Sequence, residues 1–257
     1  MTRALIVARK EIRDHLRDRR SLLSAASLAL MGPIVVLLVS FSDLARGSDG
    51  PPMLLSMLSV FALVSAFAGG TNIAMDSTAG ERERRSLLPL LLNPVPRSDV
   101  LIGKWIAVAA FSVAALALNI LGLVLVLARA APAVLVVRAP QLVVWVILGL
   151  VPLALLGAAV NLLAAAMCRT TKEAHTALSF LVFVPMIGGM FLVFFPGSFD
   201  HVWFALPIVG QQSLIGLREP HVPLARGAIV ALVTIAAAVP ALMGATGVLN
   251  RDDILSA

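Results

Sequence analysis

The strongest constraint on the fold is the recurrence of long apolar segments that contain no Asp, Glu, Lys or Arg. A helix needs about 20 such residues to cross the hydrocarbon core of a bilayer. Six segments reach this length: residues 21–42, 53–75, 105–128, 141–167, 175–195 and 227–250. The first of them is too long for the apolar part of a cleaved signal peptide, so we expect it to remain as a span. The sequence therefore predicts an all-α polytopic membrane protein with six transmembrane helices.

Composition excludes a separate soluble domain. The chain has 257 residues, of which 60% are hydrophobic and 13% charged, whereas soluble domains carry about 25% charged residues. No polar segment is long enough to fold alone, so residues 1–257 are expected to form a single transmembrane domain. The formal net charge of +6 indicates contact with an anionic membrane surface and no nucleic-acid partner.

Residues 1–20 predict an amphipathic helix that lies on the membrane surface. At 100° per residue, Leu5, Ala8, Ile12 and Leu16 share one narrow sector, and basic residues fill the sector beside it. Such a helix buries its apolar stripe and turns its basic face to lipid headgroups. The basic positions are Arg9, Lys10, Arg13 and Arg17. The alternative is a basic tail that only orients the first span, and the regular stripe favours the helix.

The longest charged stretch lies between the second and third apolar segments. Five consecutive charges, residues 81–85, precede a short apolar run with one proline, residues 87–92. The charges are too costly for hydrocarbon, and the run is too short to span it. We expect a short amphipathic helix over residues 78–92 that lies at the membrane surface and ends near Asn93-Pro94. An ordinary solvated loop is the alternative.

The segment before the last span, residues 196–226, is apolar but interrupted by prolines, glycines and the paired amides Gln211 and Gln212. This pattern predicts short helices that enter the outer leaflet and return. Because non-helical backbone at that depth needs protein or water around it, the segment should be packed inside an assembly.

Basic residues and buried amides complete the expected topology. Of the 20 Lys and Arg residues, 15 fall on the side of the N-terminus and 5 on the other side, which predicts that both termini are cytoplasmic. Asn72, Asn119 and Asn161 lie within apolar segments, where each is expected to make an interhelical hydrogen bond or to face a transport pathway.

Two stretches of sequence carry a recognisable family pattern. The first reads ERERRSL at 81–87, LL at 90–91, PVPR at 94–97 and GK at 103–104; the second reads ARKEIRD at 8–14 and RDRR at 17–20. Together with the six-span layout they resemble the ABC-2 type transporter permeases, and most closely the sodium-extrusion-like permeases of bacteria. The chain departs from that group at Leu88, where an acidic residue is frequent, and in its short loop at residues 43–52.

The resemblance implies a machine with several parts. Such permeases form homodimers or heterodimers of six-span subunits in the bacterial inner membrane. Two copies of a separate cytoplasmic ATPase drive them, with ATP and Mg on that partner and no cofactor on this chain. Residues 1–20 would be the elbow helix, 78–92 the coupling helix that docks on the ATPase, and 196–226 a re-entrant outer gate. The residues implied for the ATPase contact are Glu81, Arg82, Glu83, Arg84, Arg85, Ser86, Leu87, Leu90 and Leu91.

The expected function is therefore an exporter permease that works by alternating access and has no catalytic or metal-binding residue of its own. Its substrate stays open between sodium and an amphipathic, lipid-like molecule. The first alternative is an ATP-independent channel or pore, which would need a continuous polar lining. The second is an intramembrane enzyme, for which His175, Glu173 and Cys168, or His201 and Asp200, show no defensible spacing.

Overall fold

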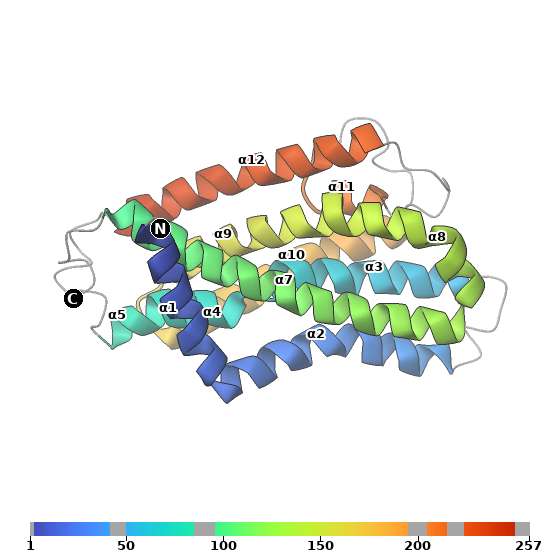
Figure 1. The fold of residues 1–257 in the computed structure, drawn as a ribbon, viewed down its shortest axis with the longest axis horizontal. Coiled ribbons are helices and arrows are strands. Elements are labelled where there is room, and N and C mark those ends of the chain that lie inside the picture. Colours follow the sequence, from blue (N-terminus) through green and yellow to red (C-terminus); the bar gives the residue numbers. More distant parts are fainter. Residues whose placement is uncertain (1–2, 42–49, 85–95, 195–204, 215–223, 250–257) are drawn as a thin grey trace.

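The computed structural model describes residues 3–41, 50–84, 96–194, 205–214 and 224–249. This part of the chain is all helical, and six of its helical segments are long and apolar enough to cross a membrane. Figure 1 shows these segments running side by side along one axis, with the first helix crossing them near one end. The all-α, six-span prediction is confirmed.

Two short helices lie at opposite ends of the bundle, Glu81–Glu83 at one end and Val209–Leu214 at the other. The elements are α1 (Arg3–Arg17), α2 (Arg19–Ser40), α3 (Gly50–Ala68), α4 (Thr71–Met75), the π-helical turn η2 (Asp76–Gly80), α5 (Glu81–Glu83), α7 (Arg97–Ala130), α8 (Pro132–Val144), the π-helical turn η3 (Trp145–Leu150), α9 (Val151–Met167), α10 (Thr171–Phe194), α11 (Val209–Leu214) and α12 (Leu224–Leu249). We call the end with α1 and α5 the α1 end, and the opposite end the α11 end (Figure 1).

The second span forms the centre of the bundle. In its most apolar window, within residues 56–83, 78% of the residues are buried, against 22% in α2, 22% in α10 and 28% in α12. The main core cluster joins α3 with α7 and α9 through side chains such as Leu63, Leu116 and Leu153. The three poorly buried helices therefore form the periphery.

The central span is broken near its middle, at Gly69-Gly70, between α3 and α4. A methyl group at Gly70 would lie 2.6 Å from Ser112 Oγ and 2.7 Å from the backbone oxygen of Val108. Only glycine allows α7 to approach the broken backbone this closely. The break was not expected from the sequence, where residues 53–75 read as one uninterrupted apolar segment.

Several helices extend beyond the expected spans. Residues 76–83, expected to include the start of a separate surface helix, instead continue the second span as η2 and α5. The third span begins at Arg97, directly after Pro96, and not at Trp105. Helix α8 begins at Pro132, within the expected loop 129–140. Pro132 suits the first turn of α8, and partners on neighbouring helices take up the charges of α5.

Helix α1 is present, and the face that it buries against the rest of the chain shares only Ala8 with the apolar stripe that we expect to face the membrane. Its buried residues are Ala4, Ala8 and Glu11, whereas Leu5 and Leu16 are 42% and 57% exposed. Small side chains allow close packing against α7, so the bulky residues stay outside. The location of this helix on a membrane surface remains a prediction, as does the re-entrant arrangement of residues 196–226, of which the structure describes 205–214 and 224–226.

Candidate functional site

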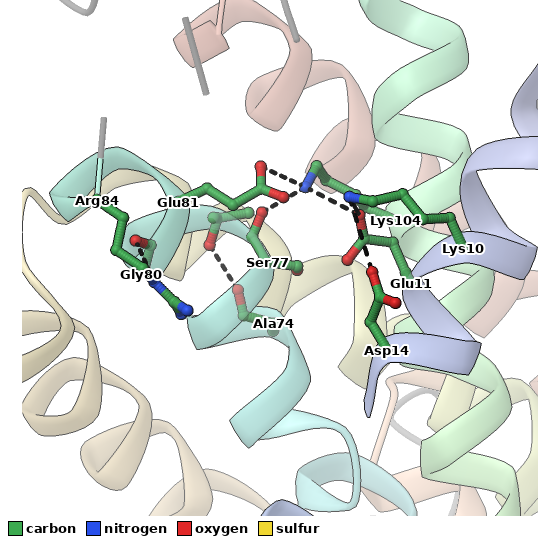
Figure 2. Close-up of polar contacts among 10 residues, drawn as sticks. Lys10, Glu11, Asp14, Ala74, Ser77, Gly80, Glu81, Arg84 and Lys104 are labelled. Carbon is green, nitrogen blue, oxygen red and sulfur yellow. Dashed lines mark hydrogen bonds and ion pairs between the residues drawn. The ribbon is translucent and has the colours of Figure 1, made fainter. Parts of the chain in front are cut away.

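The most unusual group at the α1 end is a buried lysine, Lys104, whose side chain is 1% exposed. Its Nζ donates to the backbone oxygen of Ser77 at 2.5 Å and to Glu81 Oε2 at 2.8 Å. Glu11 Oε1 lies 3.7 Å from the same nitrogen. Figure 2 shows the three side chains converging from α7, α5 and α1. We call Lys104, Glu11 and Glu81 the Lys104 cluster.

A glycine next to the lysine brings α1 close enough to form the cluster. A methyl group at Gly103 would lie 2.6 Å from Val7 Cβ and 2.7 Å from the backbone oxygen of Ala4. This close approach places Glu11, one turn beyond Val7, within reach of Lys104. His15 then packs edge-on against Phe111 of α7, with ring centroids 6.2 Å apart. Small residues on α1 and Gly103 on α7 therefore position the buried ion pair.

A second lysine lies at the surface of the cluster. Lys10 Nζ is 3.4 Å from Glu11 Oε1 and 4.0 Å from Asp14 Oδ2 (Figure 2). Burial lowers the pKa of Lys10, but the carboxylates of Glu11, Glu81 and Asp14 outweigh it, so the pKa lies above its ordinary value. Lys10 therefore stays charged and compensates part of the negative charge that the two glutamates bring inside.

The remaining charges of α5 satisfy the free ends of neighbouring helices. Arg82 donates to the backbone oxygens of Cys168 and Ala166 at 2.8 and 2.9 Å, at the end of α9. Glu83 Oε2 accepts from the backbone nitrogen and the hydroxyl of Thr171 at 2.8 and 2.7 Å, at the start of α10. Helix ends leave such groups without partners inside the helix. The start of the first loop is thereby fixed to two other spans.

These contacts bear on the residues that the sequence assigned to an ATPase partner. Glu81, Arg82 and Glu83 form hydrogen bonds within this chain. Arg84 Nε also donates within the chain, to the backbone oxygen of Gly80 at 3.2 Å. Among these four, Glu83 and Arg84 are exposed. The other residues of that set, Arg85, Ser86, Leu87, Leu90 and Leu91, lie outside the described residues. The ATPase contact stays a prediction for the whole set.

Asn72, Asn119 and Asn161 each donate a hydrogen bond to a helix other than their own. Asn161 donates to the backbone oxygen of Phe67, two residues before the break in the central span, at 2.8 Å. Asn119 of α7 donates to the backbone oxygen of Ala29 at 2.7 Å. Asn72 of α4 donates to Ser24 Oγ of α2 at 2.8 Å.

Asn72 also lines a groove of about 590 Å³ between α2, α4 and α10. The groove presents hydroxyl, amide and imidazole groups among apolar side chains: Ser24, Ser27, Thr71, Asn72, His175 and Ser179 beside Leu28, Met31, Ile34, Val35, Met75, Leu178 and Val182. It is a candidate for holding a molecule with both apolar and hydrogen-bonding parts. A role of Asn72, Asn119 or Asn161 in a pathway remains a prediction.

The paired glutamines hold α11 inside the opposite end of the bundle. Gln211 is completely buried, donates to Thr234 Oγ1 of α12 at 2.8 Å and accepts from the backbone nitrogen of Ile208. Gln212 donates to Ser59 Oγ of α3 at 2.8 Å. The backbone of Ile208 has φ of 75°, which is strained for a β-branched residue. Tertiary contacts therefore hold α11 in place against its local preference.

Two further residues belong to this network, and the sequence did not predict their contacts with α11. Trp145 Nε1 donates to the backbone oxygen of Gln211 at 2.8 Å, and Gln141 Nε2 donates to that of Leu214 at 3.2 Å. Glu11 was missed at the other end, although a signal existed. It lies in helical register with Ala4 and Ala8, so it is an acidic residue in a stripe of small apolar ones.

The residues of the enzyme alternative are engaged in local structure where they are described. Cys168 Sγ contacts the backbone oxygen of Ala164 at 3.2 Å, and Glu173 Oε2 accepts from the backbone nitrogen of Arg169 at 2.9 Å. His175 lines the groove. His201 and Asp200 lie outside the described residues.

Comparison with known proteins identifies the family. The model of the ABC-2 family transporter proteins matches residues 5–212. A curated relative, the ABC transporter permease protein NatB of Bacillus subtilis (strain 168), is 35% identical in an alignment 199 residues long, and the match covers 70% of this chain and 50% of the relative. The chain thus spans about half the length of that relative. The breadth of both matches shows that the chain belongs to the ABC-2 family of transporter proteins.

Proposed function

We propose that this chain is the membrane-spanning permease subunit of an ABC exporter, and that a separate cytoplasmic ATPase moves it by docking on the loop that begins with α5. The α1 end is then the cytoplasmic end. The observation that carries the proposal is the attachment of α5. Its side chains bond to α7 through Glu81, to the end of α9 through Arg82 and to the start of α10 through Glu83.

This attachment suits the transmission of force. A soluble ATPase can act on a permease only by contact, and a flexible loop would absorb the displacement. Here the start of the loop is a helix that continues the central span, so a push on the loop reaches that span and its neighbours together. Alternating access follows if ATP-driven approach of two ATPases favours one arrangement of these helices over another.

The family implies a second permease subunit as well as the ATPase. The groove between α2, α4 and α10 supports an amphipathic substrate, because its lining combines apolar side chains with neutral hydrogen-bonding groups. Sodium remains the other candidate. Among the described residues, no carboxylate lines this groove, so a sodium ion there would depend on hydroxyl, amide and backbone oxygens.

Reconstitution with the cognate ATPase tests the proposal. The complex should hydrolyse ATP in liposomes and transport a solute from a panel that contains sodium and amphipathic molecules. Replacing the exposed Arg84 by alanine should weaken ATPase binding, and Leu87→Asp with Leu91→Asp should abolish it. Arg169→Ala, an exposed arginine on the α9–α10 turn, is the matched control and should bind normally. A channel would conduct without ATP, and solute flux through the permease alone would refute the exporter.

A further inference from the structure

The Lys104 cluster joins elements that the proposed mechanism treats separately. Lys104 belongs to α7, Glu81 to the start of the cytoplasmic loop and Glu11 to the first helix of the chain. The side chains of Lys104 and Glu11 are 1% and 6% exposed, and that of Glu81 is 15% exposed. Charges this deeply buried are tolerated only when paired, so an arrangement that separates one of them strands the others.

The cluster therefore has a discrete geometry. The lysine nitrogen donates hydrogen bonds to Ser77 O and Glu81 and forms an ion pair with Glu11 at 3.7 Å. Sliding α1 by one turn along α7 would separate Glu11 from Lys104. It would also remove Val7 and the backbone oxygen of Ala4 from their contact with Gly103. Ionic pairing and close packing thus specify the same register of α1 on α7.

Helix α1 is also firmly connected to the first span. The backbone nitrogen of Asp18 donates to His15 O and that of Leu22 donates to Asp18 O, both at 3.1 Å. The turn between α1 and α2 therefore has helical hydrogen bonds on both sides. A displacement of α1 consequently reaches α2, which forms one wall of the groove.

We infer that Lys104 is a positioning residue that makes α1, η2–α5 and the first turns of α7 a single rigid unit. The first helix is then a driven part of the transport stroke, moved by the loop through Lys104, and not a stationary anchor in the membrane. The inference rests on the proposed function for the source of the motion. The rigid unit itself is a property of this chain alone.

Two pairs of spin labels in a Cys168→Ser background measure the motion. Leu16 of α1 and Ile102 of α7 are 57% and 40% exposed, and Met243 of α12 is 69% exposed. In the complex, a non-hydrolysable ATP analogue should leave the Leu16–Ile102 distance unchanged and shift the Leu16–Met243 distance. A change in the first distance, or a constant second distance in a complex that transports, overturns the inference.

A neutral form of the cluster tests the role of the ion pair. The variant Lys104→Met/Glu11→Gln/Glu81→Gln keeps similar side-chain volumes and leaves no buried charge unpaired. It should hydrolyse ATP but transport roughly tenfold less solute per ATP, and its Leu16–Ile102 distance distribution should broaden even in the isolated chain. Arg97→Gln is the control, because Arg97 donates from the same end of α7 to Leu249 O of α12 at 2.8 Å and lies outside the cluster.

The outcomes separate the two proposals. If the native complex neither hydrolyses ATP nor transports, the proposed function fails, while the label distances in the isolated native and neutral chains still decide the rigid unit. If the native complex works and the neutral variant shows native transport per ATP with a narrow Leu16–Ile102 distance, the inference about Lys104 is wrong.

Discussion

The two ends of this bundle are held together by different chemistry. At the α1 end, full charges join the helices: Lys104 binds Glu81, and Arg82 binds the end of α9. At the α11 end, neutral groups do so: Gln211 binds Thr234, and Trp145 binds the backbone of Gln211. Both networks are largely buried, so solvent exposure does not explain the difference.

The contrast fits different mechanical demands. A buried ion pair is costly to separate, because each partner left alone keeps its desolvation penalty. Neutral hydrogen bonds contribute about 0.5–1.5 kcal/mol each and exchange partners more readily. The α1 end is thus suited to moving as a body under load, and the α11 end to rearranging. The break at Gly69-Gly70 lies between them.

The largest expected loss of stability comes from removing only one partner of the buried ion pair at the α1 end. Lys104→Met removes the buried cation from Glu81 and Glu11 and leaves only the surface Lys10 beside Glu11, and it should destabilise the protein by about 3–5 kcal/mol. Thermal unfolding in detergent measures the loss. The neutral triple variant should recover most of it, because it removes the stranded charges too. Equal melting temperatures for the single variant and the native chain would contradict the claim that the α1 end depends on this pair.

A smaller loss of stability is expected from a substitution that faces the helix break between the two ends. A methyl group at Gly157 would lie 2.6 Å from the backbone oxygen of Phe67, which cannot move aside like a flexible side chain. Gly157→Ala should therefore destabilise the protein by about 1–3 kcal/mol. Gly247→Ala is the control, because nothing lies within 4 Å of the added methyl, and it should be neutral or stabilising. The same detergent melts compare the two.

The neutral end should lose less than the charged end when one partner is removed. Gln211→Leu leaves the backbone nitrogen of Ile208 without its acceptor. The hydroxyl of Thr234 loses its bond from Gln211 and keeps the one to the backbone oxygen of Val230. The expected cost is about 1–3 kcal/mol, below that of Lys104→Met. Gln212→Met removes a single bond to Ser59 and should cost about 1 kcal/mol. If Gln211→Leu proved more damaging than Lys104→Met, the contrast between the ends would be reversed.

The fold was predictable because membrane spans are encoded by long apolar runs, which need no knowledge of tertiary contacts. Helix ends were less predictable. Charged residues such as Glu81–Glu83 and Lys104 are expected at the solvent-exposed surface when each is considered alone. Only their tertiary partners show that a helix can continue through them. The break at Gly69-Gly70 was hidden for the opposite reason, because both flanks are equally apolar.

The site shows the same limit. Sequence patterns located the charged stretch and the buried amides, but the pairing of Lys104 with Glu11 joins residues far apart in the chain. Its geometry depends on the close contact between Gly103 and Val7. The contact of α1 with α7 was not predicted, because its buried face consists of the small Ala4 and Ala8 and the acidic Glu11, while the bulky apolar stripe was expected to face the membrane. Which of these residues an ATPase touches depends on a second protein.

The smallest expected effect uses the single cysteine as a reporter on the α1 end. Burial, followed by the carboxylate of Glu173, raises the pKa of the Cys168 thiol, and the charge of Arg82 opposes this shift only in part. The folded protein thus favours the neutral thiol, and the resulting stabilisation is present below the unfolded pKa and lost as pH rises through the folded pKa. Alkylation by iodoacetamide at pH 8 should be slower than that of a peptide thiol and should accelerate as pH rises.

Arg82→Gln turns this reporter into a test of how charge holds the α9–α10 turn. The variant loses the charged donor to the backbone oxygens of Cys168 and Ala166, so the turn should open and expose the thiol. Removing the positive charge also disfavours the thiolate, but burial is the larger cause of the shift, so exposure should dominate and alkylation at pH 8 should become faster. A rate equal to or below the native one would mean that Arg82 does not hold the turn. The charged end would then rest on the Lys104 cluster, where the cation has no access to water.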